Sequence, residues 1–431
     1  MYAPLSDMNS DSRLAIGGMW LRLYWGSIAG LLLIVTYMFW PRGILQSFKF
    51  RFRQLSTFKS KGLRVGSLTL IAIFICSAGF IFYNTNTVNV YKTSTDIEQL
   101  RLDYEKKYRQ FEHLPMPRII DVKINVDIYP YKRRVEARSS QILQNKTQQE
   151  INSIHLIFPV KTKVVAVALE GAIQQSVDEQ LGYYIFDLNK PMLPGAKLKI
   201  SFETLIQRQG FKNSRQDITL VRNGSYIKNS HLTPRVGFYS GLMLSDKNTR
   251  RDYDLEPLPR LPKLTDTDSH GNNYVRHDSD FVNFETTVST IKGQQAIAPG
   301  YLVKEWHQGE RSYFHYKMDK PMMNYYAYLS ADYEVKRDSW NGVDIEVHYH
   351  KAHEYNVDRM ITSAKDSLAY FSEAFSEYQY RQLRILEFPS YRTSATAYPN
   401  TIGFSESIGF VVDTSDRQKI DLIQYSYSTP S

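Results

Sequence analysis

The sequence predicts a membrane-anchored protein in which two transmembrane helices precede an all-β sandwich domain and the start of an α+β domain. Two long apolar runs, 20–40 and 65–83, lie near its beginning. From residue 118 apolar and polar residues alternate with the period of a β-strand, and near residue 345 the helical period returns. The predicted parts are a membrane hairpin at 1–83, a polar connector with a helix at 84–117, a β-rich domain at 118–340 and the α+β part at 341–431.

The two apolar runs have the length and composition of membrane spans. Each is long enough to cross a hydrocarbon core of ~30 Å, which takes about 20 helical residues, and the second contains no charged residue. Trp20, Trp25 and Trp40 lie in or at the ends of the first run, as expected of aromatic anchors at the membrane interface. A cleaved signal peptide is the alternative for the first run, but no small-residue cleavage site follows it.

The loop between the two runs is strongly basic. Residues 42–64 contain seven Lys or Arg and no acidic residue, so they supply most of the net charge of +9. Short basic loops stay in the cytoplasm, so everything after residue 83 is expected on the other side of the membrane. The only cysteine, Cys76, lies inside the second run, which excludes a disulfide framework. We therefore expect a bacterial inner-membrane protein with a large periplasmic part.

Local charge also decides which partners are expected. Because the basic residues are concentrated in one loop, the folded part has no basic surface that would favour nucleic acid, and no nucleic-acid or nucleotide-binding motif occurs. The bilayer is the expected partner of the two apolar runs.

The region after the second run changes from helical to strand patterning. Residues 94–113 carry apolar positions three to four apart and predict an amphipathic helix. Five apolar residues from Ile120 to Ile128 then alternate with polar ones, which predicts a half-buried antiparallel strand in an all-β unit of two packed sheets. The Pro- and Asp-rich segment 246–273 is expected to be an ordered excursion or an exposed loop. Further strands are predicted at 154–158, 164–169, 183–188, 197–202, 281–289, 313–318 and 325–329.

The last part of the chain begins with an amphipathic helix. A buried strand is predicted at 382–388, and the run GFSESIGF at 403–410 follows it. A helix followed by strands predicts a new α+β domain. The apolar face of the predicted helix contains Val357, Ile361, Ala364, Leu368, Phe371 and Phe375.

The histidines do not form a zinc motif of the HEXXH type. That motif needs two His four residues apart, because only this spacing turns both imidazoles toward one metal from one helix. None of the ten His has this spacing, and His353–Glu354 is followed by Val357 where the second His would stand. His348, His350 and His353 could together bind a metal, but we favour three exposed polar His at the end of a strand.

The GFSESIGF run resembles the GxMEN substrate loop, commonly GAMENWGL, of the aminopeptidase N family of zinc metallopeptidases. Gly403, Glu406 and Gly409 match the two glycines and the Glu, whereas Ser405, Ser407 and Ile408 depart from the family pattern. The resemblance extends over most of the chain. NGVDIEVHYH at 341–350 is similar to the opening of the family's catalytic domain. The β region, with APGYL and EW, is similar to the family's N-terminal saddle domain. The hairpin resembles that of members fused behind an ABC-transporter permease region.

The resemblance implies a thermolysin-like fold for the α+β part and a zinc aminopeptidase that removes N-terminal residues from periplasmic peptides. It implies that Glu406 holds the substrate's α-ammonium group and that Gly403 lets a peptide backbone approach. Zinc is the implied cofactor and ABC-transporter components are implied partners. Because the chain ends before HEXXH, no catalytic or zinc-binding residue can be named, and this chain alone is expected to be inactive.

Taken without the resemblance, Glu406 reads as an ordinary solvated residue of a strand. A non-catalytic membrane-anchored β-sandwich that binds peptides or scaffolds a transporter is therefore the alternative function. An envelope-sensing receptor would share the same topology.

Overall fold

The computed structural model describes residues 5–9, 15–40, 60–212, 217–271, 273, 275–416 and 420–428. Contacts divide the chain into two units. The helical unit comprises Met1–Leu5, Ser10–Lys92 and Gln209–Asp217, and the β-rich unit comprises Ser6–Asn9, Thr93–Arg208 and Ile218–Ser431. Most of the predicted basic loop, residues 42–59, lies outside the described residues.

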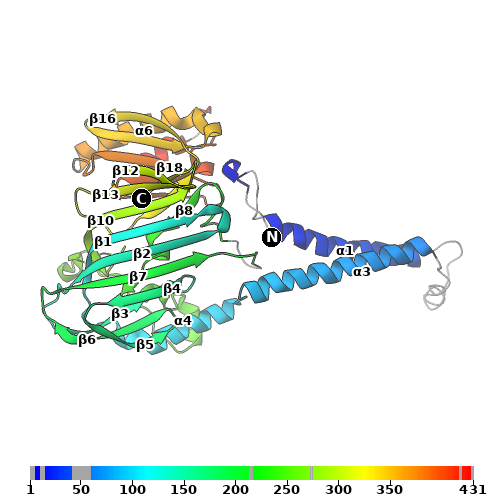
Figure 1. Cartoon of the computed structure of the whole chain (residues 1–431), viewed down its shortest axis with the longest axis horizontal. Helices are drawn as coiled ribbons and strands as arrows, with labels where there is room; N and C mark the ends of the chain where they lie inside the picture. The colour runs from blue at the N-terminus through cyan, green and yellow to red at the C-terminus, as the bar shows by residue number, and fades with distance from the viewer. Residues whose placement is uncertain are drawn as a thin grey trace. The chain divides into compact units, whose positions relative to one another are not determined.

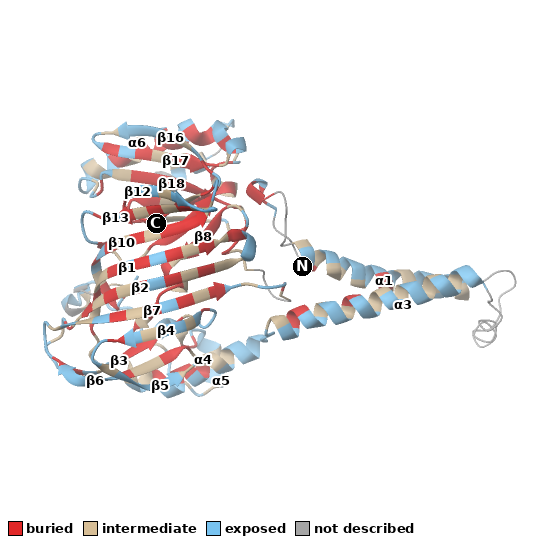
Figure 2. Cartoon of the chain, viewed as in Figure 1, coloured by how far each residue is buried: buried red, intermediate tan, exposed pale blue. Residues whose placement is uncertain are grey.

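The helical unit contains the two predicted apolar helices, α1 (Ala15–Phe39) and α3 (Lys61–Phe82). Both are long and apolar enough to cross a membrane, and their side chains are exposed or only partly covered along nearly the whole length (Figure 2). The helices pack on each other through aromatic rings, with centroids 4.2 Å apart for Trp20 and Phe80 and 4.9 Å apart for Tyr24 and Phe74. This confirms two apolar helices that are compatible with a membrane anchor. The π-helical turn η3 (Tyr83–Val88) continues α3.

The predicted amphipathic helix forms as α4 (Ser94–Tyr108), followed by a 3-10 turn, η4 (Arg109–Phe111). A capping box between Thr93 and Asp96 starts α4, since each side chain accepts a hydrogen bond from the other residue's backbone. Its buried face contains Glu105 as well as apolar residues. Arg250 donates to both carboxylate oxygens of Glu105 at 2.9 Å, which ties the segment after residue 246 to α4.

The largest sheet has eight strands and is centred on β1 (Figure 1). The predicted strand at 118–128 pairs antiparallel with β2, as expected, but parallel with β10. The parallel pairing was not foreseen, because β10 follows only after a long connection that includes other sheets. The strands are β12 (Tyr301–Gln308), β13 (Arg311–Lys317), β10 (Ser279–Ile291), β1 (Arg118–Tyr129), β2 (Arg134–Gln144), β7 (Lys197–Gln207) and β4 (Lys163–Leu169), with β14 (Met322–Met323) beside β10.

Two smaller sheets complete the β region. It therefore has three sheets, and the prediction of two was wrong. Apolar residues from all three sheets share one buried cluster, as Val126, Ile154 and Tyr328 illustrate. One small sheet contains β5 (Ala172–Asp178), β6 (Tyr183–Met192), β3 (Ile151–Ile157) and β9 (Arg235–Val236), and the other contains β11 (Gln295–Ile297), β15 (Ala327–Ala331) and β8 (Ser225–Lys228).

The Pro- and Asp-rich excursion contains two short helical pieces, α5 (Lys247–Asp252) and η8 (Thr267–Gly271). Asp246 caps α5 by accepting from the Thr249 N–H at 2.8 Å. Leu261 and Leu264 are 79% and 95% exposed, so the middle of the excursion adds nothing to the core. Short helical turns connect the remaining strands: η5 (Pro130–Lys132), η6 (Asn229–His231) and η7 (Ser240–Leu242).

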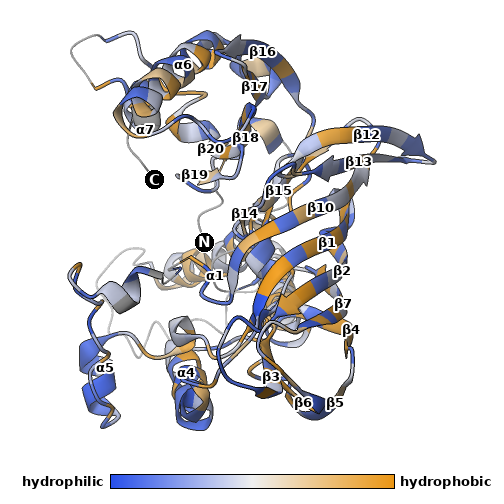
Figure 3. Cartoon of the chain, turned by 90° about the vertical axis from the view of Figure 1, so that its left-hand side faces the viewer, coloured by the Kyte–Doolittle hydropathy of each residue, from blue (hydrophilic) through white to orange (hydrophobic). Residues whose placement is uncertain are grey.

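The last sheet has the order β16–β17–β18–β20–β19 and joins its three central strands in parallel. Helix α6 connects β17 to β18 and lies against this sheet, with α7 beside α6 (Figure 3). The predicted strand at 382–388 matches β18. The elements are β16 (Glu334–Trp340), β17 (Val343–Tyr349), η9 (Lys351–Asn356), α6 (Val357–Ala374), β18 (Gln382–Phe388), β19 (Ala395–Tyr398), β20 (Thr401–Ser405), η10 (Glu406–Ile408) and α7 (Leu422–Ser428).

The buried face of α6 is shorter than predicted. Val357, Ile361, Ala364 and Leu368 are buried, but Phe375 is 77% exposed. Phe375 has φ −130° and ψ −70°, so the chain has left the helix at this residue and the ring no longer follows the helical face.

A buried ion pair joins β9 to the entry of β10 and gives a first prediction. Arg276 donates to the Asp278 carboxylate at 2.7 and 2.6 Å, and the Val236 N–H donates to it at 2.9 Å. Burial alone would raise the pKa of Asp278, but the Arg276 charge outweighs it and lowers the pKa to about 2. Replacing Asp278 by Asn should lower the free energy of unfolding by about 3 kcal/mol at pH 7, because a buried guanidinium loses its counter-charge.

The pH dependence has a defined sign. The folded-state pKa of Asp278 lies below its ordinary value. The ion pair therefore contributes fully to the free energy of unfolding above about pH 4, and this contribution is lost as the pH falls toward 2. Urea unfolding of the detergent-solubilised protein, followed by circular dichroism, measures this. The difference in the free energy of unfolding between the wild type and Asp278→Asn should shrink below pH 4. Asp319→Asn, at an exposed pair with Arg381, is the control and should cost less than about 1 kcal/mol. Equal stability of Asp278→Asn and the control at pH 7 would contradict this prediction.

Candidate functional site

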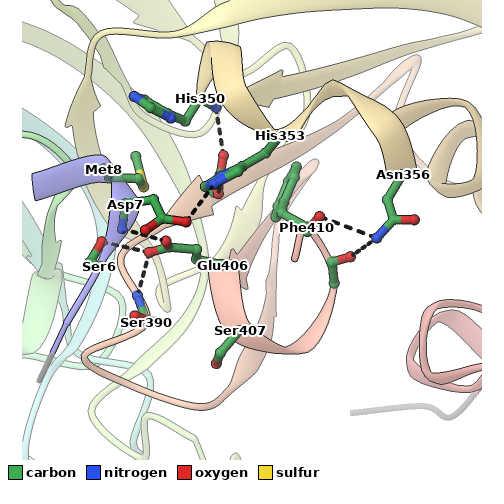
Figure 4. A network of polar contacts seen from close by, with 12 residues as sticks. Ser6, Asp7, Met8, His350, His353, Asn356, Ser390, Glu406, Ser407 and Phe410 are labelled. Carbon is green, nitrogen blue, oxygen red and sulfur yellow. Dashed lines mark hydrogen bonds and ion pairs between the residues drawn. The ribbon is translucent and has the colours of Figure 1, made fainter. Parts of the chain in front are cut away.

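The site lies where the parallel strands of the five-stranded sheet end. Glu387 is near the end of β18, Glu406 follows β20 directly, and His350 and His353 follow β17. Carboxyl ends of neighbouring parallel strands meet at one edge of a sheet, where open α/β folds place their ligands. Glu406 is therefore brought near His350 and His353 (Figure 4), and Glu387 contacts both His residues.

Glu406 is buried, with 2% of its surface exposed, and starts the 3-10 turn η10. The expectation of an ordinary solvated residue of a strand was wrong, because Glu406 is buried and lies in a turn that follows the strand. The preceding strand β20 runs between β18 and β19, and Ser405 caps the turn by accepting from the Ser407 N–H. Burial of a carboxylate requires compensating donors.

Three donors satisfy the Glu406 carboxylate (Figure 4). Oε2 accepts from the Ser6 hydroxyl at 2.5 Å and from the Ser390 N–H at 2.9 Å. Oε1 accepts from the Asp7 N–H at 2.7 Å. Two of these donors belong to the amino-terminal segment of the chain itself, and one of them is a peptide N–H.

The amino-terminal segment Ser6–Asn9, whose last three residues form the 3-10 turn η1 (Asp7–Asn9), is fixed at both ends. The side chain of Met8 is buried in a cluster that includes Tyr226 and Phe388. Asn9 Oδ1 accepts from the Asn223 N–H at 2.9 Å, and Asn9 Nδ2 donates to the Asn223 carbonyl at 2.5 Å. The segment is therefore bound by one apolar anchor and by polar contacts on either side of it.

His353 is held between two carboxylates. Its Nδ1 lies 2.6 Å from Glu387 Oε1, and its Nε2 lies 3.5 Å from Asp7 Oδ2. Burial lowers the pKa of His353, but Glu387 and Glu406 outweigh it and leave the pKa raised. Burial raises the pKa of Glu387, whose Oε2 also accepts from the His350 N–H at 2.6 Å.

The prediction of three exposed His at the end of β17 was wrong. His348 and His353 are 5% and 2% exposed, and only His350 is partly accessible. The reason is the turn η9, which follows β17 and folds His353 back onto Glu387 of β18. A single sequence does not reveal such a reversal, because the residues of η9 are mostly polar.

Gly403 lies in the middle of β20, which is hydrogen-bonded to β18 on one side and β19 on the other. β20 therefore has no free edge to which a bound peptide could add as a strand. A Cβ at Gly403 would lie 3.4 Å from the Tyr226 ring and 3.7 Å from Phe388, so the glycine leaves room for the apolar cluster that holds Met8.

The zinc motif of the aminopeptidase N family does not fit the residues present. Val357, which stands where the second His would be, is the first residue of α6, and its side chain is completely buried in the core. His353 has φ −113° and ψ 27°, so the backbone at this position is not helical and cannot present an i, i+4 pair. No reaction step is therefore assigned to a zinc ion of that type.

Comparisons with known proteins do not identify a family. No protein-family model matches the chain, and no curated protein matches it.

Sequence reasoning identified Glu406 but missed Ser6, Asp7 and Glu387. Glu387 did carry a signal, because a carboxylate between the apolar residues Leu386 and Phe388 is unusual in a buried strand and points to a bound partner. Ser6 and Asp7 carried none, since their contacts with Glu406 span about 400 residues of sequence.

The hydrogen bond from Asp7 gives a second prediction. Replacing Glu406 by Ala removes the acceptor of the Asp7 N–H and of the Ser6 hydroxyl, and hydrogen bonds to a charged group contribute about 1.5–3 kcal/mol each. Amide exchange in residues 5–9 should become at least about tenfold faster, as measured by hydrogen exchange with mass spectrometry. Glu354→Ala, which removes an exposed carboxylate next to His353, is the matched control and should leave this exchange unchanged. Unaltered exchange in Glu406→Ala would show that the carboxylate does not hold the segment.

Proposed function

We propose that the β-rich unit binds peptides, with Glu406 accepting hydrogen bonds from N–H groups at one end of the bound segment. The observation that carries this proposal is the hydrogen bond of Glu406 with the backbone N–H of Asp7, next to the buried side chain of Met8. In the resembling family the Glu at this place holds the amino end of a peptide. The amino-terminal segment of the chain thus serves as a bound peptide in the site.

The contacts define what such a site would recognise. An ionised carboxylate forms strong, short hydrogen bonds with N–H donors and favours an ammonium group over a neutral amide. The rings of Tyr226 and Phe388 favour an unbranched apolar side chain such as Met, and Asn223 pairs with a polar residue that follows it. We expect a preference for short segments with an apolar residue next to the anchored N–H.

We propose that the chain is the substrate-binding part of a membrane-tethered aminopeptidase of the aminopeptidase N type. The β region would be its saddle domain, and the last sheet would be part of a thermolysin-like domain. The two apolar helices would anchor it in a bacterial inner membrane with the β-rich unit in the periplasm, beside ABC-transporter components. By itself this chain is proposed to bind peptides without hydrolysing them, because the described residues lack the family's zinc ligands.

Binding of the amino-terminal sequence in trans is the third prediction and tests this proposal. A variant lacking residues 1–9 should bind a synthetic peptide of residues 5–9, as measured by fluorescence anisotropy of the labelled peptide. The same deletion combined with Glu406→Ala should bind it at least about tenfold more weakly, since the anchored N–H loses its charged acceptor. The deletion combined with Glu354→Ala is the control and should bind normally.

Two outcomes would contradict the proposal. Absence of peptide binding to a folded deletion variant would remove the peptide-binding function. EDTA-sensitive release of an amino-acid aminocoumarin by the purified chain would show that it hydrolyses peptides, against the expectation that it only binds them.

A scaffold without exchangeable ligands is the second candidate function. It is favoured by the extent to which the segment is built into the fold, since Met8 is 4% exposed and Asn9 is 8% exposed. In that case the deletion variant would lose stability and gain no affinity for the peptide.

A further inference from the structure

Asp7 and Glu406 of the proposed peptide site also form a cluster with His353 that peptide binding does not explain. One ligand-type atom each from Asp7, His353 and Glu406 lie within 4.8 Å of one another. The three residues come from η1, η9 and η10, so they converge from separate segments of the β-rich unit (Figure 4). Exposed acidic groups often gather without binding anything, so the cluster alone defines no site.

The first observation that points to a ligand is Nε2 of His353, which forms an ion pair with Asp7 but no hydrogen bond. The side chain is 3% exposed, and Nε2 has no hydrogen-bond partner among the residues that the structure describes. A buried polar atom left unpaired costs about 1–3 kcal/mol. Nε2 is directed toward Asp7 Oδ2, at 3.5 Å, which is too long for a hydrogen bond but leaves room for an ion that both atoms could bind.

The second observation is the support of the other ring nitrogen. Nδ1 lies 2.6 Å from Glu387 Oε1, and Glu387 is completely buried and fixed in turn by the His350 N–H. Histidines that bind a metal typically donate their second ring N–H to a carboxylate, which fixes the ring and makes the ligating nitrogen more basic. In the neutral ring with its proton on Nδ1, the Nε2 lone pair lies on the side of Asp7 and Glu406, where a metal ion would replace the second ring proton.

Charge and lone pairs agree with a cation at this place. Asp7, Glu387 and Glu406 surround one imidazole, so the group is anionic unless a cation joins it. The Glu406 carboxylate offers about four lone-pair directions, and its three hydrogen bonds use three of them. The Asp7 side chain is 75% exposed, so it can turn to complete a coordination shell without disturbing the core.

We propose that a divalent transition metal of the Zn²⁺ class binds between His353 Nε2, the Asp7 carboxylate and the remaining lone pair of Glu406. One imidazole with two carboxylates suits Zn²⁺ or Co²⁺, whereas Mg²⁺ and Ca²⁺ prefer oxygen ligands alone. Tetrahedral Zn²⁺ takes such N and O ligands at about 2.0–2.2 Å and would keep a fourth position for water. This site uses none of the spacing of an HEXXH motif.

The position of Asp7 gives the site a further consequence. Asp7 belongs to the amino-terminal segment, whereas His353 and Glu406 belong to the sheet that receives it. A metal bound by all three would hold the segment in place, since a ligand that binds one state stabilises that state. The metal site itself rests only on the geometry of the three residues, and its effect on peptide access rests on the proposed function.

The test is Zn²⁺ binding to the purified full chain in detergent, measured by isothermal titration calorimetry, with the Co²⁺ absorption spectrum as a second readout. One equivalent should bind, and Asp7→Asn should weaken binding at least about tenfold, because the carboxylate is a direct ligand. The Asp7 side chain is exposed, so Asp7→Asn should fold normally, which circular dichroism checks. His315→Ala, which removes a His–Glu contact of 2.9 Å in the large sheet, is the matched control. Millimolar Mg²⁺ should not compete.

Hydrogen exchange supplies the second measurement. Zn²⁺ should slow amide exchange in residues 5–9 of the wild type and leave it unchanged in Asp7→Asn. Absence of Zn²⁺ binding by the wild type, or binding that Asp7→Asn and Glu406→Gln leave unaltered, would overturn the proposal. The peptide-binding function is tested separately by the variant lacking residues 1–9, which contains no Asp7, so failure of one proposal is distinguishable from failure of the other.

Discussion

The burial of the Glu406 carboxylate is the constraint on which this end of the molecule depends. A carboxylate with 2% exposure is stable only if donors replace its water, and they come from Ser6, Asp7 and Ser390. The hydrogen bonds to the Glu406 carboxylate therefore join the amino-terminal segment, the turn after β18 and the end of β20. The same requirement explains why Ser6–Asn9 groups with the β-rich unit although its neighbours in sequence group with the helices.

Glu387 has a related but different role. It is completely buried, and its two oxygens contact His353 Nδ1 and the His350 N–H, so it fixes the turn that leaves β17. Because Glu387 belongs to the central strand β18, its position is set by the sheet. Glu406 receives the amino-terminal segment, and Glu387 orients the imidazole beside it. The proposed peptide anchor and the proposed metal ligands thus share one edge of the sheet.

Much of the fold could be predicted from local patterns. The apolar helices α1 and α3, the helix α4 and the strand β18 each carry a signal in their own residues, and their predicted ranges overlap the observed ones closely. The parallel pairing of β1 with β10 and the third sheet in the β region could not be predicted, because they depend on contacts between distant segments. Phe375 shows a smaller error of the same kind, since the helical pattern continues past the residue where the helix ends.

The site was predictable in part and for a clear reason. The GFSESIGF run marks Glu406, but its partners are visible only after folding, because Ser6 and Asp7 lie about 400 residues away in sequence. The central claim is that Glu406 and Ser6 stabilise each other. A double-mutant cycle on the free energy of unfolding with Glu406→Gln and Ser6→Ala measures this directly. We predict a coupling energy of about 1.5–3 kcal/mol. A coupling energy of zero would contradict the account.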